Sequence, residues 1–462
     1  MSTGKLEVGK TAGIERVPFI STIASATSRW STRWVPDAYV IAVLLTFIAA
    51  AFALIFTPSS LLQIIDYWGQ GFWVLLTFGM QMALVVFTGY VLAVAPPVGR
   101  LLNQIAGWAK TPRQAVFIMA VVSMVLGLIN WGLSIVGSAV FVRYLARKVR
   151  GVDYRLLVAA AYLGLGTTWH AGLSASAPLL VATPKHFLEA QIGIIPVTQT
   201  IFNPFNMLMV LAVIVVLSII TPLMSPRKSE TVEVEPALLE EMKDFEPPVR
   251  PELTTPAVGM ENSPLVNLAI GLMGLVWLAN YFWTKGLVIT LDVVNFTFLM
   301  LGVLLHRTPA SLLKAAQEAG GFVWGIILQF PFYAGIFGIV NYSHLSDVIG
   351  NWFVSISTAR TYPLIVYWYS GLLNYFVPSG GSKWAIEAPY ILSAAKTLGV
   401  SANTTVLAYA WGDMMTDIIQ PFWAIPLLGV AKLKFRDIMG FCIVIFIVYA
   451  ILVSLGFYFL PF

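Results

Sequence analysis

The 462 residues are 58% hydrophobic and only 11% charged, and the mean hydropathy is +0.82. A water-soluble domain could not cover this much apolar surface with polar side chains, so the solvent of the chain is lipid. The net charge of +5 comes mainly from Lys and Arg in loops, as expected for the cytoplasmic loops of a membrane protein. We therefore expect no nucleic-acid partner. A single cysteine, Cys442, excludes an internal disulfide and a cysteine-built metal site, and we expect neither a metal centre nor an organic cofactor.

The N-terminal part predicts a cytoplasmic leader followed by two membrane spans. Residues 1–36 are polar and basic, which places the N-terminus in the cytoplasm of a multi-pass inner-membrane protein. Apolar runs at about 37–57 and 72–95 reach the roughly 20 residues that a helix needs to cross the hydrocarbon of a bilayer.

The next apolar stretch, about 115–145, is too long for one span, and basic residues such as Arg113 and Arg150 flank both of its ends. Its middle, Asn-Trp-Gly-Leu-Ser at 130–134, is a poor place for continuous helix. Length and charge together predict a re-entrant hairpin that enters and leaves the membrane on the cytoplasmic side. Two short full spans are the alternative.

Spans at about 156–183 and 201–224 complete a first unit, 37–224. Residues 225–262 are polar, acidic and rich in proline, which predicts a flexible cytoplasmic linker, and we assign it no site. A connecting transmembrane helix at 263–285 leads to a second unit, 286–462. That unit contains another long interrupted stretch, 362–396, and the parity of the crossings makes it a hairpin that opens from the outside.

The two units repeat one another in sequence. Gly-Leu-Ile-Asn-Trp at 127–131 recurs as Gly-Leu-Leu-Asn-Tyr at 371–375, and a Gly-Ser pair follows each copy at the same offset. An odd number of crossings separates the copies, so they insert with opposite orientation. The predicted fold is therefore an all-α polytopic membrane protein with inverted repeats, each with a re-entrant helical hairpin and an interrupted transmembrane helix. Such repeats are typical of alternating-access carriers.

Interrupted helices expose backbone groups that can bind a solute. Free N–H groups at helix N-termini attract a carboxylate, glycine admits close approach, and hydroxyl and amide side chains add neutral hydrogen bonds. Small-residue contacts between helices are the alternative reading. We expect a small carboxylate substrate, and the candidate binding residues are Asn130, Gly132, Ser134, Ser138, Ser174, Ser176, Asn374, Ser379, Gly380, Gly381, Ser382 and Lys383.

A charged side chain within the bilayer is energetically costly, so residues of this kind normally have a functional role. Asp413 and Asp417 are four residues apart and share a helix face with Thr416, while His170 lies in the matching region of the first repeat. These four residues are the candidate ion-coupling residues, with H⁺ as the coupling ion or Na⁺ near Asp413 as the alternative. Lys383 and Glu387 are four residues apart and can form an ion pair that neutralises both charges. The alternative is that Lys383 is the counter-ion of the substrate carboxylate.

Several segments resemble the bacterial short-chain fatty acid transporter family of the ion transporter superfamily. They are Trp-Val-Pro-Asp at 34–37, Gly-Phe-Trp at 71–73, Phe-Gly-Met-Gln-Met-Ala-Leu at 78–84, Ile-Asn-Trp-Gly at 129–132, Gln-Phe-Pro-Phe-Tyr-Ala-Gly at 329–335, Val-Pro-Ser-Gly-Gly at 377–381 and Gln-Pro-Phe-Trp-Ala at 420–424. The resemblance implies uptake of acetoacetate and butyrate, an elevator motion of a hairpin domain, and a homodimer. The first hairpin lacks the Ser-Gly-Gly of the second, so the resemblance does not imply equal roles for the two tips.

Other functions fit less well. A carrier or exporter for another organic acid, such as a dicarboxylate or branched keto acid, is the nearest alternative. An intramembrane hydrolase is disfavoured because the sequence has no His-Glu-x-x-His or Gly-x-Ser-x-Gly motif. Inverted repeats also have no role in such an enzyme, so we expect a transporter.

Overall fold

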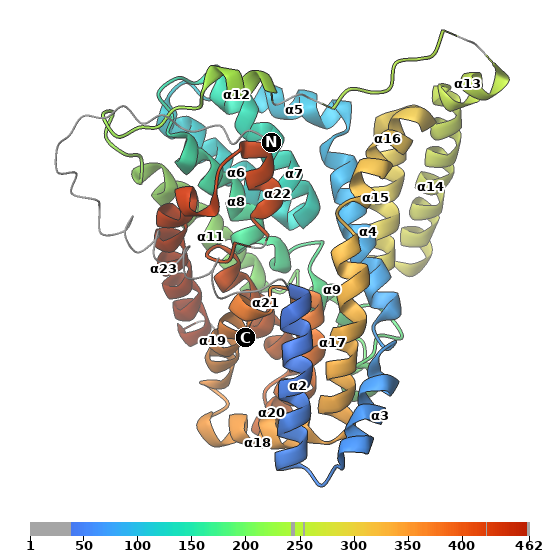
Figure 1. Ribbon diagram of the computed structural model, residues 1–462, viewed down its shortest axis with the longest axis vertical. Coiled ribbons are helices and arrows are strands. Elements are labelled where there is room, and N and C mark those ends of the chain that lie inside the picture. The colour runs from blue at the N-terminus through green and yellow to red at the C-terminus, as the bar shows by residue number, and fades with distance from the viewer. Residues whose placement is uncertain (1–37, 242–244, 253–254, 422, 460–462) are drawn as a thin grey trace.

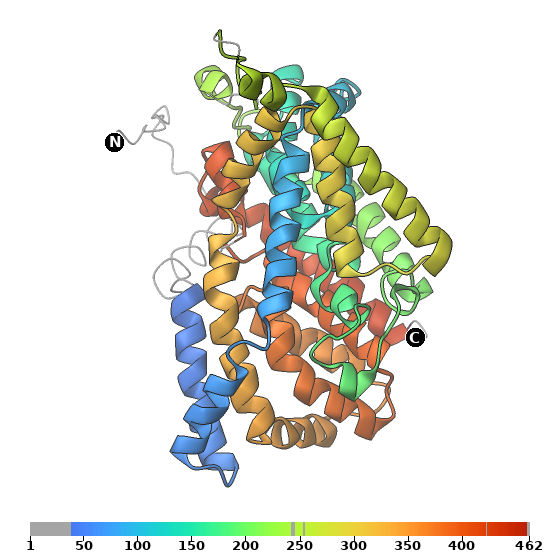
Figure 2. The same cartoon turned by 90° about the vertical axis from the view of Figure 1, so that its right-hand side faces the viewer.

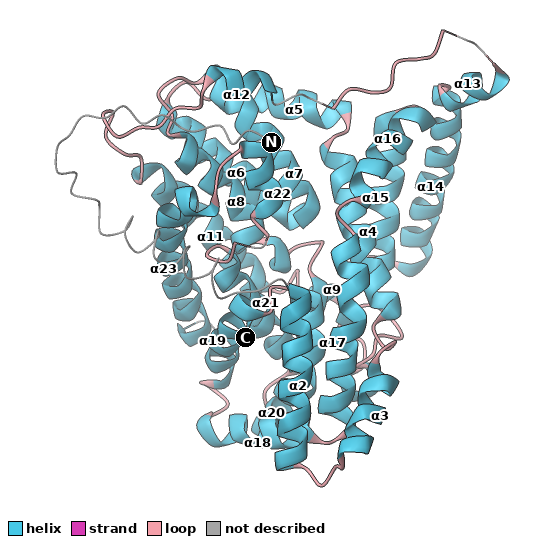
Figure 3. Ribbon diagram, viewed as in Figure 1, coloured by secondary structure: helices cyan, strands magenta, loops and turns pink. Residues whose placement is uncertain are grey.

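The computed structural model describes residues 38–241, 245–252, 255–421 and 423–459, and these residues form helices and loops without a strand (Figures 1 and 3). Eight of the described helical segments are long and apolar enough to cross a membrane. The predicted all-helical membrane fold is confirmed.

The first repeat begins with four helices, α2 (Ala38–Phe56), α3 (Leu61–Gly71), α4 (Leu76–Ala93) and α5 (Pro96–Ala106). It continues with the hairpin arms α6 (Pro112–Ile129) and α7 (Trp131–Lys148), then α8 (Tyr154–Thr167), η1 (Trp169–Ala171), α9 (Ser176–Val181), α10 (Glu189–Ile192), η2 (Val197–Gln199) and α11 (Pro204–Leu223). The linker contains α12 (Pro236–Glu241) and α13 (Pro256–Glu261), and α14 (Pro264–Lys285) follows.

The second repeat has the same order of helices as the first. It comprises α15 (Leu291–His306), α16 (Pro309–Gly320), α17 (Trp324–Tyr342), α18 (Leu345–Ile356), the hairpin arms α19 (Tyr362–Phe376) and α20 (Gly380–Leu398), α21 (Ala402–Asp417), α22 (Ile425–Ala431) and α23 (Phe435–Phe459). Thus α3 corresponds to α16, and α5 to α18. Figure 1 shows α5 and α16 at one end of the molecule and α3 and α18 at the other, so the counterparts have opposite orientation.

Both interrupted stretches fold as hairpins because a polar residue at each break caps the second arm. The Asn130 side chain accepts a hydrogen bond from the Leu133 N–H, and the Ser379 side chain accepts one from the Ser382 N–H. The outer ends of the first hairpin also meet, since a Cβ atom built on Gly151 would lie 3.7 Å from Cγ of Pro112. The first stretch therefore enters and leaves at one end of the molecule.

Each hairpin packs on the interrupted helix of its own repeat through glycines. A Cβ atom on Gly127 of α6 would lie 2.5 Å from the carbonyl oxygen of Gly164 in α8. In the second repeat, a Cβ atom on Gly371 of α19 would lie 3.0 Å from the carbonyl oxygen of Gly412 in α21. The repeated glycines thus let paired helices approach closely in both halves, as is common in membrane proteins.

The helices gather into two bodies. The helices α2, α3, α4, α14, α15, α16 and α17 pack on one another, whereas the hairpins pack on α8, α21 and α23 (Figure 2). The bodies meet where α4 packs on α7 and α17 packs on α20. Each hairpin therefore presents its second arm to the other body.

The fold predicts which hairpin ends share a side of the membrane. In a Cys442→Ser background, Arg113→Cys and Arg150→Cys should react with an impermeant thiol reagent from one face, and Arg360→Cys and Ser401→Cys from the opposite face. All four positions are exposed, and Cys442 is buried, so the background substitution removes no accessible thiol. Labelling of positions 113 and 150 from opposite faces would contradict the first hairpin.

Candidate functional site

The tips of the two hairpins open on one cavity. A cavity of about 360 Å³ is lined by Trp131 and Gly132 at the start of α7, and by Pro378 and Ser379 just before α20. Its remaining lining is mainly aromatic and aliphatic, from α4, α17 and the segment after α21, and includes Val86, Phe330, Tyr333 and Trp423. The cavity therefore combines two helix N-termini, which attract anions, with an apolar wall.

Asn130 fixes the first tip to the opposite body. Its Nδ2 donates to the Val85 carbonyl of α4 at 3.0 Å, while its Oδ1 accepts from the Leu133 N–H at 2.9 Å. The contact requires Gly89 in α4, because a Cβ atom there would lie 2.1 Å from Oδ1 of Asn130. The side chain of Asn130 is thus fully engaged in positioning the tip.

The second tip lies directly over a buried charge. The Tyr409 hydroxyl donates to the Gly380 carbonyl at 2.5 Å, and the Trp423 Nε1–H donates to the Pro378 carbonyl at 2.7 Å. A Cβ atom on Gly380 would lie 2.6 Å from Oδ2 of Asp413. Only glycine allows the tip to approach the carboxylate this closely.

A cluster of buried charges stands behind this tip. Nζ of Lys383 lies 3.1 Å from Oδ1 of Asp413 and 3.2 Å from Oε1 of Glu387, and it donates to the Ser370 hydroxyl at 2.6 Å. The side chains of Lys383, Glu387 and Asp413 are at most 1% exposed. The predicted Lys383–Glu387 pair is therefore present, but Lys383 contacts a second carboxylate as well.

His170 joins the cluster from the break in the first repeat. Its Nδ1 lies 2.8 Å from Oδ2 of Asp413, and its Nε2 accepts the Ala177 backbone N–H at 3.2 Å and lies 2.8 Å from the Ser176 hydroxyl. A backbone N–H can only donate, so Nε2 must be the acceptor and the ring proton sits on Nδ1, facing Asp413. This geometry favours the neutral imidazole.

Asp417 has a different environment from Asp413. Its Oδ1 accepts from Nδ2 of Asn374 at 2.7 Å, and its Oδ2 accepts from Nε1 of Trp169 at 3.0 Å. Trp169 in turn stacks on His170, with ring centroids 4.3 Å apart. Both side-chain donors to the Asp417 carboxylate are neutral, whereas Asp413 contacts an ammonium group.

The other predicted residues have mainly structural contacts. Ser134 donates to the Ser123 carbonyl at 2.9 Å, Ser174 accepts the Trp131 N–H at 2.9 Å, and Thr416 donates to the Gly371 carbonyl at 2.7 Å. Ser138 is buried within α7. Of the predicted substrate residues, Gly132 and Ser379 line the cavity; Gly381 and Ser382 stand in the first turn of α20, where Gly381 faces Phe330.

Sequence reasoning missed the aromatic residues of the site. The rings of Trp131 and Trp423 both line the cavity and pack edge-to-face on one another, with centroids 5.2 Å apart, and each stands beside a break that the sequence does show. Gln81 and Gln329 lie in the corresponding helices α4 and α17, yet Gln81 donates to Asp292 while Gln329 lines the cavity. The position of these aromatic residues beside the repeat-matched breaks could have indicated that they line the site.

Comparison with known proteins places the chain in a family. A family model described as "Short chain fatty acid transporter" matches residues 19–460. A protein of Escherichia coli strain K12 with the provisional name short-chain fatty acid transporter is 42% identical over 424 residues, covering 92% of this chain and 96% of that protein. A protein of Haemophilus influenzae with the same provisional name is 37% identical over 448 residues, covering 96% of this chain and 100% of that protein.

Two solved structures share the fold at low sequence identity. The YdaH transporter of Alcanivorax borkumensis has a TM-score of 0.54 at 16% identity, covering 91% of this chain and 98% of that one. MtrF of Neisseria gonorrhoeae, whose structure is described as illuminating a class of antimetabolite efflux pumps, has a TM-score of 0.54 at 15% identity, covering 94% of this chain and 96% of that one. The near full-length family match and the two close relatives show that the chain is a transporter and belongs to the short-chain fatty acid transporter family.

Proposed function

We propose that the protein carries short-chain monocarboxylates such as butyrate and acetoacetate across the bacterial inner membrane together with protons. The observation that carries this proposal is the shared cavity at the hairpin tips, which has an apolar wall and adjoins buried carboxylates. Uptake of labelled butyrate and acetoacetate into proteoliposomes, with pH and sodium gradients imposed separately, tests it.

The cavity suits an anion with a short apolar tail. The N-termini of α7 and α20 supply partial positive charge, and Gly132 and Ser379, which line the cavity at these two ends, mark where the carboxylate would lie. Phe330, Tyr333 and Trp423 would then enclose the acyl chain. A fatty acid of a few carbons buries its tail here, while a dicarboxylate would place a second charge against the aromatic wall at a desolvation cost.

Charge balance argues for bound protons. Within the described part of the chain, Lys383 is the single buried cation of the cluster, and it contacts the carboxylates of Glu387 and Asp413. The third carboxylate, Asp417, has only neutral side-chain donors, and His170 is held neutral. Full ionisation would leave two uncompensated negative charges in a site without solvent contact, which is strongly unfavourable. Protons on carboxyl groups remove this charge.

Protonation would also favour substrate binding. Ser379 lines the cavity, and the adjacent Gly380 approaches Asp413, so an incoming carboxylate lies near the cluster. Two like charges about 8 Å apart repel by about 2 kcal/mol at an effective dielectric of about 20. Proton and substrate therefore bind cooperatively, and the pair moves without net charge against an inside-negative potential.

The contacts of Asp413 favour H⁺ over Na⁺. Its Oδ1 faces the ammonium of Lys383 and its Oδ2 faces Nδ1 of His170. A sodium ion at these oxygens would have to displace a buried ammonium group or lie against it. The Asp417 carboxylate, whose described side-chain donors are neutral, is the better proton carrier.

The two bodies suggest how the site moves. Because the hairpins meet the other body along α4 with α7 and α17 with α20, a sliding motion at these contacts would carry the hairpin tips and the charge cluster together past the wall that α4 and α17 contribute. We therefore propose an elevator motion of the hairpin body, with the other body as the scaffold. The homodimer remains a proposal, which the mass of the purified protein in detergent would test.

Substitution of the cavity wall should change the chain-length preference. Phe330→Ala should weaken butyrate transport by about tenfold, because a few lost apolar contacts are worth about 1–3 kcal/mol, and should improve hexanoate relative to butyrate. Phe332→Ala is the matched control on the same helix, since its ring contacts Tyr39 and Phe72 instead. Competition of labelled butyrate uptake by acids of increasing length measures the preference. An unchanged profile in Phe330→Ala would refute the placement of the acyl chain.

Removal of the proton carrier should separate coupling from transport. Asp417→Asn should lose accumulation driven by a pH gradient in sodium-free vesicles but retain butyrate exchange, because an amide cannot carry the proton. Asp347→Asn is the control, since that side chain is 60% exposed and lies outside the cluster. Wild-type accumulation by Asp417→Asn would remove this carboxylate from coupling, and accumulation that requires sodium and ignores the pH gradient would assign the coupling to Na⁺.

A further inference from the structure

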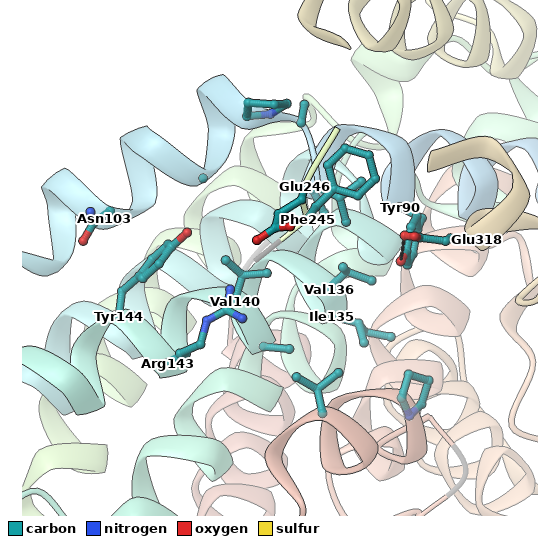
Figure 4. A pocket seen from close by; sticks show the side chains of 18 of the residues that line it. Tyr90, Asn103, Ile135, Val136, Val140, Arg143, Tyr144, Phe245, Glu246 and Glu318 are labelled. Atoms are coloured by element: carbon teal, nitrogen blue, oxygen red, sulfur yellow. Dashed lines mark hydrogen bonds between the residues drawn. The ribbon is translucent and has the colours of Figure 1, made fainter. Parts of the chain in front are cut away.

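A second, larger cavity adjoins the hairpin-tip cavity. It has a volume of about 670 Å³ and lies among α4, α5, α7, α16 and the linker (Figure 4). The two cavities share lining residues, which are Tyr90, Ile135, Val136, Phe322 and Pro426. The larger cavity, called the vestibule below, is therefore an approach to the hairpin tips from the end of the molecule that carries α5 and α16.

Two linker residues, Phe245 and Glu246, line this vestibule. In the view of Figure 4 they lie between Arg143 and Tyr144 on one side and Tyr90 on the other. The linker thus forms part of the wall of the cavity between the hairpin tips and the end of the molecule that carries α5 and α16.

Phe245 and Glu246 are attached to the scaffold body. The ring of Phe245 lies 5.4 Å from Nζ of Lys314 and 5.4 Å from the ring of His306, and Nζ of Lys314 donates to the Glu246 carbonyl at 2.8 Å. Phe245 also packs against the small buried cluster of Val91, Ala315 and Ala319. A cation over an aromatic ring, an edge contact and apolar burial together hold this segment against α16.

The preceding part of the linker is attached to the hairpin body. The Val232 backbone exchanges hydrogen bonds with this body, since its N–H donates to Oδ2 of Asp153 at 3.0 Å and its carbonyl accepts the Tyr154 N–H at 2.8 Å. Nη2 of Arg147 donates to the Leu239 carbonyl at 2.7 Å. The described parts of the linker on either side of residues 242–244 are therefore attached to different bodies.

We propose that Phe245 and Glu246 form a plug in the vestibule that must leave before a solute can pass between the hairpin tips and the cytoplasm. The plug lines the vestibule, and the vestibule shares lining residues with the hairpin-tip cavity. The vestibule is also lined by Arg100, Arg143, Lys314 and Glu318, so the carboxylate of Glu246 reduces the positive charge that would attract an anion into it. Because its two attachments lie on different bodies, a shift of one body against the other pulls on the plug.

A reversible lock tests the plug directly. In a Cys442→Ser background, Glu246→Cys and Lys314→Cys place two thiols where Nζ of Lys314 now donates to the Glu246 backbone carbonyl, and a short cleavable reagent with two thiol-reactive ends joins them. Joining should lower butyrate uptake by about tenfold or more, because only molecules whose plug is free to leave can transport. Cleavage of the reagent by reductant should restore uptake. Equal uptake before and after joining would overturn the plug, as would failure of the reagent to join the two positions.

Accessibility gives a readout that does not depend on the substrate. With Val140→Cys as the reporter in the vestibule, Phe245→Ala should raise its labelling rate by about tenfold from the cytoplasmic side, since the plug no longer packs on α16. Val249→Ala is the matched control, because that side chain is in the same linker and is 93% exposed. An unchanged labelling rate in Phe245→Ala would overturn the plug. Absence of carboxylate uptake by the unjoined protein would instead count against the proposed function, and the labelling result would still decide the plug.

Discussion

The ion pair between Lys383 and Asp413 is the interaction around which the rest of the site is arranged. An ammonium group and a carboxylate without solvent contact persist only if their remaining hydrogen-bonding positions are filled, and Ser370, Glu387 and His170 fill them. These partners come from both arms of the second hairpin and from the break in the first repeat. The pair therefore ties together segments that are more than 200 residues apart in the sequence, since His170 and Asp413 are separated by 243 positions.

The two halves of the inverted repeat share one backbone framework but carry different polar groups at their breaks. Asn130 and Ser379 cap equivalent helices, and Gly127 and Gly371 allow equivalent close approaches. The first half nevertheless fills its break with hydroxyl groups and a neutral histidine, while the second half carries the charges. The first tip is held through Asn130 on α4, whereas the second tip lies over the carboxylate of Asp413. Substrate binding and charge compensation can thus be divided between the two halves without disturbing the shared framework.

The sequence predicted the framework better than the site. Apolar length, the distribution of Lys and Arg, and the Gly-Leu-x-Asn motif gave the spans, the two hairpins and their repetition, because these patterns reflect the bilayer itself. Side-chain direction was not accessible in the same way. Ser134 and Ser174 were expected at the substrate, but their hydroxyl groups bond to backbone groups of the hairpin arms, and Ser138 is buried within α7. Glu387 was considered only as a partner of Lys383. Whether a small polar residue on a hairpin faces a cavity or a neighbouring helix depends on packing between distant segments, which a single sequence does not contain. The linker shows the same limit, since its composition gave no sign that Phe245 would reach the vestibule.

The central claim is that an anionic substrate and a proton bind together because the buried cluster cannot hold the added negative charge. Calorimetric titration of butyrate into the purified protein, at one pH in two buffers with different ionisation enthalpies, measures the protons taken up on binding. The account predicts uptake of about one proton per bound substrate, since binding shifts the protonation equilibrium of the cluster. The same observed binding enthalpy in both buffers would mean that no proton is exchanged, and would contradict it.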